Sequence, residues 1–362
     1  GRANENIGLT AVHEVFHNEH NRIIALTKQM VRDALAAGDT GFATNWVLAG
    51  TNLVDGIQEN EWNGDRLFQV GKFATEMQYQ HLVFEEFARK ISPTIHLCAN
   101  VDIHLNPAIT AEFAHAVYRF GHSMLDETLP RFNLNADGTS ADTAVGGTQM
   151  GLIEAFLNPV AYFNQGASAA GQLVQGTTHQ IGNEIDEFVT GALRNNLLGL
   201  PLDLAALNIA RGRDTGVAPL NLVRKEIFTQ TNDANLKPYD SWADMGNFLK
   251  HPASLINFVA AYGTHNTITG AADLAAKRAA ALNLVTLGLD PTSANSAVVA
   301  AHDAWDFMHS AGIYANNVNN PIAVHATYST GSVTGVDNVD LWIGGRSEEH
   351  TSELQSPYVI SY

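Results

Sequence analysis

Cysteine is almost absent from this sequence, because Cys98 is the single cysteine among 362 residues. A disulfide within one chain needs two thiols and a cysteine-rich metal site needs more, so the sequence excludes both. A lone thiol fits a reducing compartment, and it also fits a secreted bacterial-type protein that folds without disulfides.

Basic residues are scarce: 20 lysines and arginines stand against 37 aspartates and glutamates, for a net charge of -17. This balance argues against nucleic acid or an anionic membrane surface as a partner. Long apolar runs are missing too, since no stretch approaches the roughly 20 residues that span a bilayer. We therefore expect no nucleic-acid partner and no membrane span. The hydrophobic content of 45% still allows a large buried core.

Both ends of the chain lack features of a complete protein. The sequence begins Gly-Arg-Ala, with neither an initiator methionine nor a targeting segment, so we expect a fragment of a longer protein. Residues 346–362 begin Arg-Ser-Glu-Glu-His-Thr and resemble a translated sequencing adapter. We expect residues 1–345 to form the domain, and residues 346–362 to be a non-native tail that packs poorly.

The most conspicuous local motif is His13-Glu-Val-Phe-His17. In this pattern two histidines one helical turn apart bind zinc and the glutamate acts as a general base. A zinc hydrolase needs a third protein ligand. His20 stands where the extended form of the motif has glycine. Zinc hydrolysis is therefore our third-ranked hypothesis, and we expect these histidines not to converge with an acidic residue.

His122 is the stronger candidate for a metal ligand. The run from Thr110 to Asp126 predicts a helix with Thr110 as its N-cap. Its expected core-facing stripe consists of Phe113, Val117, Phe120, Gly121 and Met124. Gly121 has no side chain, so a flat group can approach the helix beside His122. By itself, a lone histidine on a half-apolar helix is more often a core residue than a ligand.

A second polar run, from Asp203 to Gly216, can complement a ligating histidine. Asn208 offers a neutral oxygen that can accept a hydrogen bond from a histidine Nδ1–H and fix its tautomer. Arg211 follows one turn later on the same face and can bind a carboxylate. The alternative is an asparagine cap beside a surface Arg–Asp pair.

Several stretches resemble, in the same order, the motifs of the animal-type haem peroxidases. They are Arg2-Ala-Asn-Glu5 with the following Glu19-His-Asn-Arg22, Trp62 to Leu67, Arg119-Phe-Gly-His122, Asn208 to Gly216, and Asp337 to Gly345. The resemblance covers almost the whole chain. It implies a mostly α fold, with one large helical domain around a buried haem b.

The resemblance also implies a role for each proximal residue. His122 corresponds to the axial ligand of the iron, and Asn208 to the residue that orients it. Arg119 and Arg211 are candidates for the haem propionates.

On the distal side, Arg2 corresponds to the arginine that polarises bound peroxide. Glu5 occupies the place of a glutamate that can form an ester with a haem methyl group. The plainer interpretation makes both of them solvated charges of an N-terminal turn.

The activity implied is the reduction of hydrogen peroxide coupled to oxidation of a halide or a small organic electron donor. The family resemblance also implies an extracellular, secreted protein connected with the response to oxidative stress. The family's distal histidine and calcium-binding loop would precede Arg2, so we expect this fragment to be impaired and calcium to bind only the full-length parent. The alternative function is a non-catalytic module of the same fold that serves adhesion or matrix binding.

Overall fold

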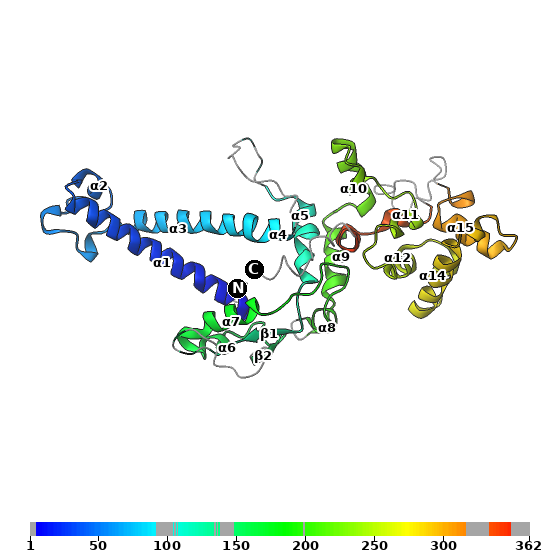
Figure 1. The fold of residues 1–362 in the computed structure, drawn as a ribbon, viewed down its shortest axis with the longest axis horizontal. Helices are drawn as coiled ribbons and strands as arrows, with labels where there is room; N and C mark the ends of the chain where they lie inside the picture. The colour runs from blue at the N-terminus through cyan, green and yellow to red at the C-terminus, as the bar shows by residue number, and fades with distance from the viewer. Residues whose placement is uncertain are drawn as a thin grey trace. The chain divides into compact units, whose positions relative to one another are not determined.

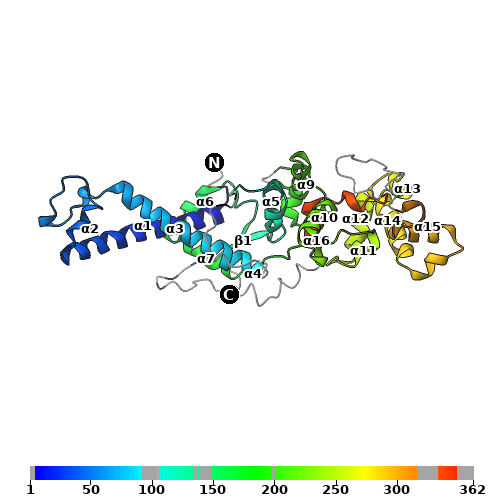
Figure 2. The same cartoon turned by 90° about the horizontal axis from the view of Figure 1, so that it is seen from above.

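The computed structural model describes residues 5–91, 104, 106, 108–133, 135, 137, 148–197, 200–315 and 333–348. The described chain is mostly helical with one two-stranded sheet, which confirms the expected fold class. It forms two compact units (Figures 1 and 2). Unit 1 comprises residues 1–100 and 127–181, and unit 2 comprises residues 101–126 and 182–362. The expected single domain around one haem stays a prediction.

Unit 1 is built on a long N-terminal helix. Its elements are α1 (Ile7–Ala36), α2 (Thr40–Thr44), α3 (Gly64–His81), a π-helix (Leu82–Ala88), α4 (Arg89–Ile91), β1 (Thr128–Arg131), β2 (Thr148–Gly151), α6 (Pro159–Phe163) and α7 (Ala169–Thr178). The side chain of Asn6 caps α1 by accepting a hydrogen bond from the backbone N–H of Gly8 at 2.7 Å. Asparagine is among the best N-cap residues because its oxygen satisfies a free donor of the first turn.

Unit 1 has two small cores along α1. Ile7 and Ala11 pack with residues of α6, α7 and the sheet, including Tyr162 and Leu173. At the other end, Val31 packs against the loop and helix residues that surround Trp62. The strands of the sheet are antiparallel, with Thr128 opposite Gly151.

The glycine of α7 that faces β1 is required for this packing. A Cβ added to Gly176 would lie 2.0 Å from the carbonyl oxygen of Pro130, so only glycine allows the two backbones to come this close.

Helix α3 runs beside α1 (Figure 1), but it buries only a narrow stripe. Leu67 and Gly71 are its buried residues, and the ring of His20 fills the space that a Cβ at Gly71 would need. The aromatic residues of this segment follow a helical spacing, but they do not form a core, since Phe68 and Phe73 are 51% and 61% exposed. No helix among the described residues is long and apolar enough to cross a membrane.

Unit 2 contains the larger hydrophobic core. Its helices are α5 (Ala111–His115), a 3-10 helix (Val117–His122), α8 (Gly191–Asn195), α9 (Leu204–Asp214), α10 (Leu220–Thr231), α11 (Trp242–Gly246), α12 (Ser254–Tyr262), α13 (Asn266–Thr269), α14 (Leu274–Gly288), α15 (Val299–Met308) and α16 (Leu341–Ser347). Helix α14 packs against α12 and α15 (Figure 2). Trp242, fully buried, donates its indole N–H to the carbonyl of Thr334 at 2.9 Å.

The first residues of the expected foreign tail are buried within unit 2. Arg346, Ser347 and Glu348 are all buried, so the expectation of poor packing is wrong for these three residues. The carbonyl of Ser347 accepts a hydrogen bond from the backbone N–H of Lys250 at 2.9 Å. Residues 349–362 lie outside the described residues.

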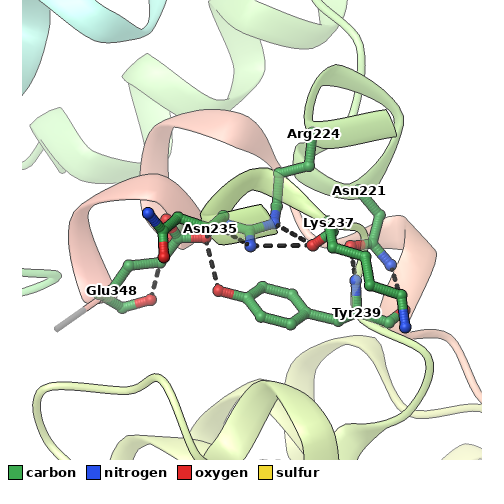
Figure 3. Close-up of polar contacts among 8 residues, drawn as sticks. Asn221, Arg224, Asn235, Lys237, Tyr239 and Glu348 are labelled. Carbon is green, nitrogen blue, oxygen red and sulfur yellow. Dashed lines mark hydrogen bonds and ion pairs between the residues drawn. The ribbon is translucent and has the colours of Figure 1, made fainter. Parts of the chain in front are cut away.

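Glu348 completes a buried polar network with α10 (Figure 3). Its Oε1 accepts hydrogen bonds from Arg224 Nη1 and from the Tyr239 hydroxyl, both at 2.8 Å. The same guanidinium donates to the carbonyls of Asn235 and Lys237 at 2.7 to 3.0 Å. Burial and the carboxylate of Glu348 raise the pKa of Tyr239. Arg224 and Glu348 thus form an ion pair in which both charged groups have further hydrogen bonds, as a buried ion pair requires.

Candidate functional site

The chain before His122 is not the continuous helix that its spacing predicts. Thr110 caps α5, as expected, by accepting from the N–H of Phe113 at 3.3 Å. The helix ends at His115, and Ala116, with φ -125° and ψ -68°, turns the chain into a 3-10 helix that ends at His122. Ala116 is 3% exposed, and its carbonyl accepts from the N–H of Arg119, which tightens the turn to three residues.

The break changes which side chains face the core. Phe113 and Val117, two members of the expected stripe, are 42% and 51% exposed, so that part of the prediction is wrong. The 3-10 turn instead carries Arg119 and His122 toward α9, where both contact Asn208.

His122 and Asn208 lie within hydrogen-bonding distance, 86 residues apart in the sequence. Asn208 is completely buried on α9, and its Nδ2 lies 2.8 Å from Nδ1 of His122. The contact that the sequence predicts is therefore present. The roles of both residues toward haem stay a prediction.

The amide of Asn208 has the opposite orientation to the one expected. Its Oδ1 accepts a hydrogen bond from Arg119 Nη1 at 3.1 Å. A guanidinium only donates, so the oxygen must face Arg119 and the NH₂ group must face His122. Nδ1 of His122 is then an acceptor, and the proton of the neutral ring lies on Nε2. The expectation that the amide oxygen accepts from Nδ1–H is wrong for this arrangement.

The surroundings of His122 favour a neutral imidazole and an added negative charge. Burial, followed by the positive charges of Arg346, Arg119 and Arg211, lowers the pKa of His122 to about 4. The ring is therefore uncharged at neutral pH. Arg211 is exposed on α9. Anionic groups such as carboxylates would find favourable charges here.

Trp342 of the last motif and Arg346, just after it, also belong to the surroundings of this site, and the sequence analysis assigned a role to neither. Trp342 donates its indole N–H to the backbone carbonyl of Arg119 at 3.3 Å. Arg346 is 5% exposed, its guanidinium lies 4.2 Å from the Trp342 ring, and its three nitrogens have no hydrogen-bond partner among the described residues. The Asp-Leu-Trp run within the last motif was a signal for Trp342, whereas Arg346 belongs to the expected non-native tail.

The residues around His122 fit a haem in several respects. Nε2 of His122 has no hydrogen-bond partner among the described residues, so it can serve as the ligating nitrogen. A Cβ added to Gly121 would meet nothing within 4 Å, so the backbone beside His122 is open to a flat group. Arg119 and Arg211 can bind carboxylates. One rearrangement is needed, because Nε2 must lose its proton before it can bind a metal.

The residues expected on the distal side are Arg2 and Glu5. Arg2 lies outside the described residues. Glu5 belongs to unit 1, where it is half-buried and its backbone carbonyl accepts from the N–H of Leu157 at 2.8 Å. The catalytic role of Arg2 and the ester linkage through Glu5 stay predictions.

The histidines of α1 do not lie in a group with metal-binding geometry among the described residues. The group that brings three ligand atoms together there, within 4.8 Å of one another, is Glu184, Asp186 and His251. Glu14 accepts a hydrogen bond from the Tyr162 hydroxyl. Nε2 of His20 lies 3.3 Å from the carbonyl oxygen of Phe68.

A family model described as animal haem peroxidase matches residues 1–271. Peroxinectin A of Dictyostelium discoideum is 25% identical over 248 residues, which cover 67% of this chain and 38% of that protein. A human peroxidasin homolog is 26% identical over 262 residues, which cover 69% of this chain and 15% of that protein.

A solved structure has a similar fold. Peroxidase A from Dictyostelium discoideum aligns with a TM-score of 0.54 and 19% identity, over 99% of this chain and 48% of that chain. This chain therefore spans less than half of the length of the relatives that it matches.

Proposed function

The chain belongs to the animal haem peroxidase family, and we propose that it is part of a haem-dependent peroxidase that holds a haem b through His122. The observation that carries the proposal is the pairing of a neutral His122 with a completely buried Asn208, beside Arg119 and an open backbone at Gly121. Bound haem would supply the redox chemistry by which peroxide is reduced and a halide or small organic donor is oxidised.

We assign the following roles to the chain's own residues. His122 would bind the iron through Nε2, while Asn208 fixes the orientation of the ring. Arg119 and Arg211 would bind the propionate carboxylates through charge-assisted hydrogen bonds. The lowered pKa of His122 supports this assignment, because a metal ligand must be unprotonated on the ligating nitrogen.

On the distal side, Arg2 would donate hydrogen bonds to the peroxide and stabilise the negative charge that develops on it. Glu5 would lie near the haem edge, where it could form an ester. An extracellular location and a calcium requirement of the full-length parent complete the proposal.

Haem titration of the apo protein tests the assignment of His122. We expect the wild-type chain to give a Soret band at one haem per chain and His122→Ala to lose it or to bind far more weakly. His302→Ala removes a half-exposed histidine of α15 and serves as the control, which should bind like the wild type. Equal haem affinity in His122→Ala and the wild type would remove the assignment. Haem binding without any spectral response to peroxide in the full-length parent would favour the non-catalytic adhesion module.

A further inference from the structure

Asn208 is shared between two residues that make conflicting demands on its amide. Arg119 Nη1 donates to Oδ1 at 3.1 Å, and Nδ2 lies 2.8 Å from Nδ1 of His122. Because Asn208 is 0% exposed, water cannot easily replace either partner. The orientation of the amide that satisfies Arg119 is the one that places a donor against His122.

This arrangement selects one tautomer of His122. An NH₂ group facing Nδ1 stabilises the ring with its proton on Nε2. The other tautomer would bring Nδ1–H against the NH₂ group, donor against donor, in a buried place. An unpaired buried donor disfavours that tautomer by roughly tenfold to a hundredfold in population. Binding of a metal through Nε2 requires this disfavoured tautomer.

We propose that Arg119 is a latch on Asn208 that keeps His122 in the non-ligating tautomer until carboxylates of the cofactor draw the guanidinium away. The inference rests on the proposed function. Once Arg119 binds a carboxylate, the amide can turn and offer Oδ1 to Nδ1–H. The proton leaves Nε2 and another arrives on Nδ1 through solvent, so the charge of the ring does not change. Binding of the carboxylates by Arg119 is thus coupled to the loss of the proton from Nε2 of His122.

The tautomer of His122 can be measured without haem. Long-range ¹H–¹⁵N spectra of the apo protein labelled at histidine report which ring nitrogen carries the proton, and His122→Gln identifies the signal. We expect Nε2–H in the wild type and a shift toward Nδ1–H of about tenfold or more in Arg119→Met. Arg211→Met removes the same charge without a contact to Asn208, so it should keep the wild-type tautomer. Equal tautomer ratios in all three proteins would overturn the latch.

Asn208→Asp provides a second variant that retains Arg119. A carboxylate can accept from Arg119 on one oxygen and from Nδ1–H on the other, so this protein should carry the Nδ1 proton although Arg119 is unchanged. An Nε2–H ring without a proton on Nδ1 in Asn208→Asp would contradict the proposal.

Comparing the affinity for haem with the affinity for its dimethyl ester distinguishes the latch from a simple ion pair between Arg119 and a propionate. The ester lacks free carboxylates, so it cannot draw Arg119 away from Asn208. We expect Arg119→Met to bind the ester about tenfold more tightly than the wild type, since the latch is already open. An arginine that merely pairs with a propionate predicts no gain for the ester, and that result would refute the coupling. If no variant bound haem while the tautomers changed as expected, the proposed function would fail and the latch on Asn208 would stand.

Discussion

Arg224 and Arg346 are two buried arginines of unit 2 with opposite surroundings. They are 4% and 5% exposed. Arg224 is paired with the carboxylate of Glu348 and donates to two backbone carbonyls. None of the three guanidinium nitrogens of Arg346 has a hydrogen-bond partner among the described residues. We expect leucine substitutions at these positions to change stability in opposite directions.

The expected magnitude for Arg346→Leu follows from its surroundings. Burial, opposed in part by the charges of Asp186 and Glu187, lowers the pKa of Arg346 by between two and three units, to about 10. At about 1.4 kcal/mol per pKa unit, the buried charge costs about 3 kcal/mol at neutral pH. The substitution also removes the cation–π contact with Trp342, and this loss offsets about 1 kcal/mol of the stability gained by removing the buried charge. Arg346→Leu should therefore raise the free energy of unfolding by about 2 kcal/mol.

Arg224→Leu is the matched comparison. It removes the partner of a buried carboxylate, a change that typically costs about 3–5 kcal/mol. Urea unfolding at pH 7, followed by tryptophan fluorescence, should give a higher midpoint for Arg346→Leu and a much lower one for Arg224→Leu, with unchanged slopes. Because the folded-state pKa of Arg346 is depressed, its cost is present below pH 10 and shrinks as the pH rises through that value. A loss of 1 kcal/mol or more in Arg346→Leu would refute the reasoning, because it would mean that the guanidinium has a stabilising partner.

Three further predictions concern other parts of the chain. Since the pKa of His122 falls from 6.5 to about 4 on folding, the free energy of unfolding of the apo protein should decrease by up to about 3 kcal/mol as the pH is lowered from 6.5 to 4. His122→Gln should flatten that part of a profile of urea midpoint against pH, and an unchanged profile would contradict the pKa shift. Gly176→Ala should destabilise unit 1 by about 1–3 kcal/mol in thermal unfolding, because its Cβ would overlap the carbonyl of Pro130, and a neutral effect would show that the hairpin can shift. Arg2→Lys in the full-length parent should slow the reaction with peroxide by roughly ten- to a thousandfold in stopped-flow measurements while haem binding survives, and an unchanged rate would remove Arg2 from the distal site.

Sequence patterns predicted the features that depend on nearby residues. The cap at Thr110 is correct because an N-cap needs only its own side chain and the next turn. The predominance of helix, which the family resemblance implies, is correct as well. The meeting of His122 and Asn208 was predicted from the order of family motifs rather than from local spacing.

The features that the sequence did not predict depend on partners far away in the chain. The helix before His122 breaks at Ala116, although the helical spacing continues through it, because tertiary contacts override a local period. The exposed aromatic residues of α3 follow the same spacing as a buried stripe, and periodicity alone does not specify what packs against them. The orientation of the Asn208 amide depends on a third residue, Arg119, 89 residues away.

Arg119 connects three motifs that the sequence displays separately. Its backbone carbonyl accepts the indole N–H of Trp342, and its guanidinium donates to Asn208, which contacts His122. The Trp342 contact restricts the backbone from which the guanidinium extends, so the position of Arg119 depends on α16 as well as on α9. A change at Trp342 would then alter the hydrogen bond between Arg119 and Asn208 without touching His122. These three motifs are thus physically linked, because each supplies one partner of the same buried amide or of the arginine that orients it.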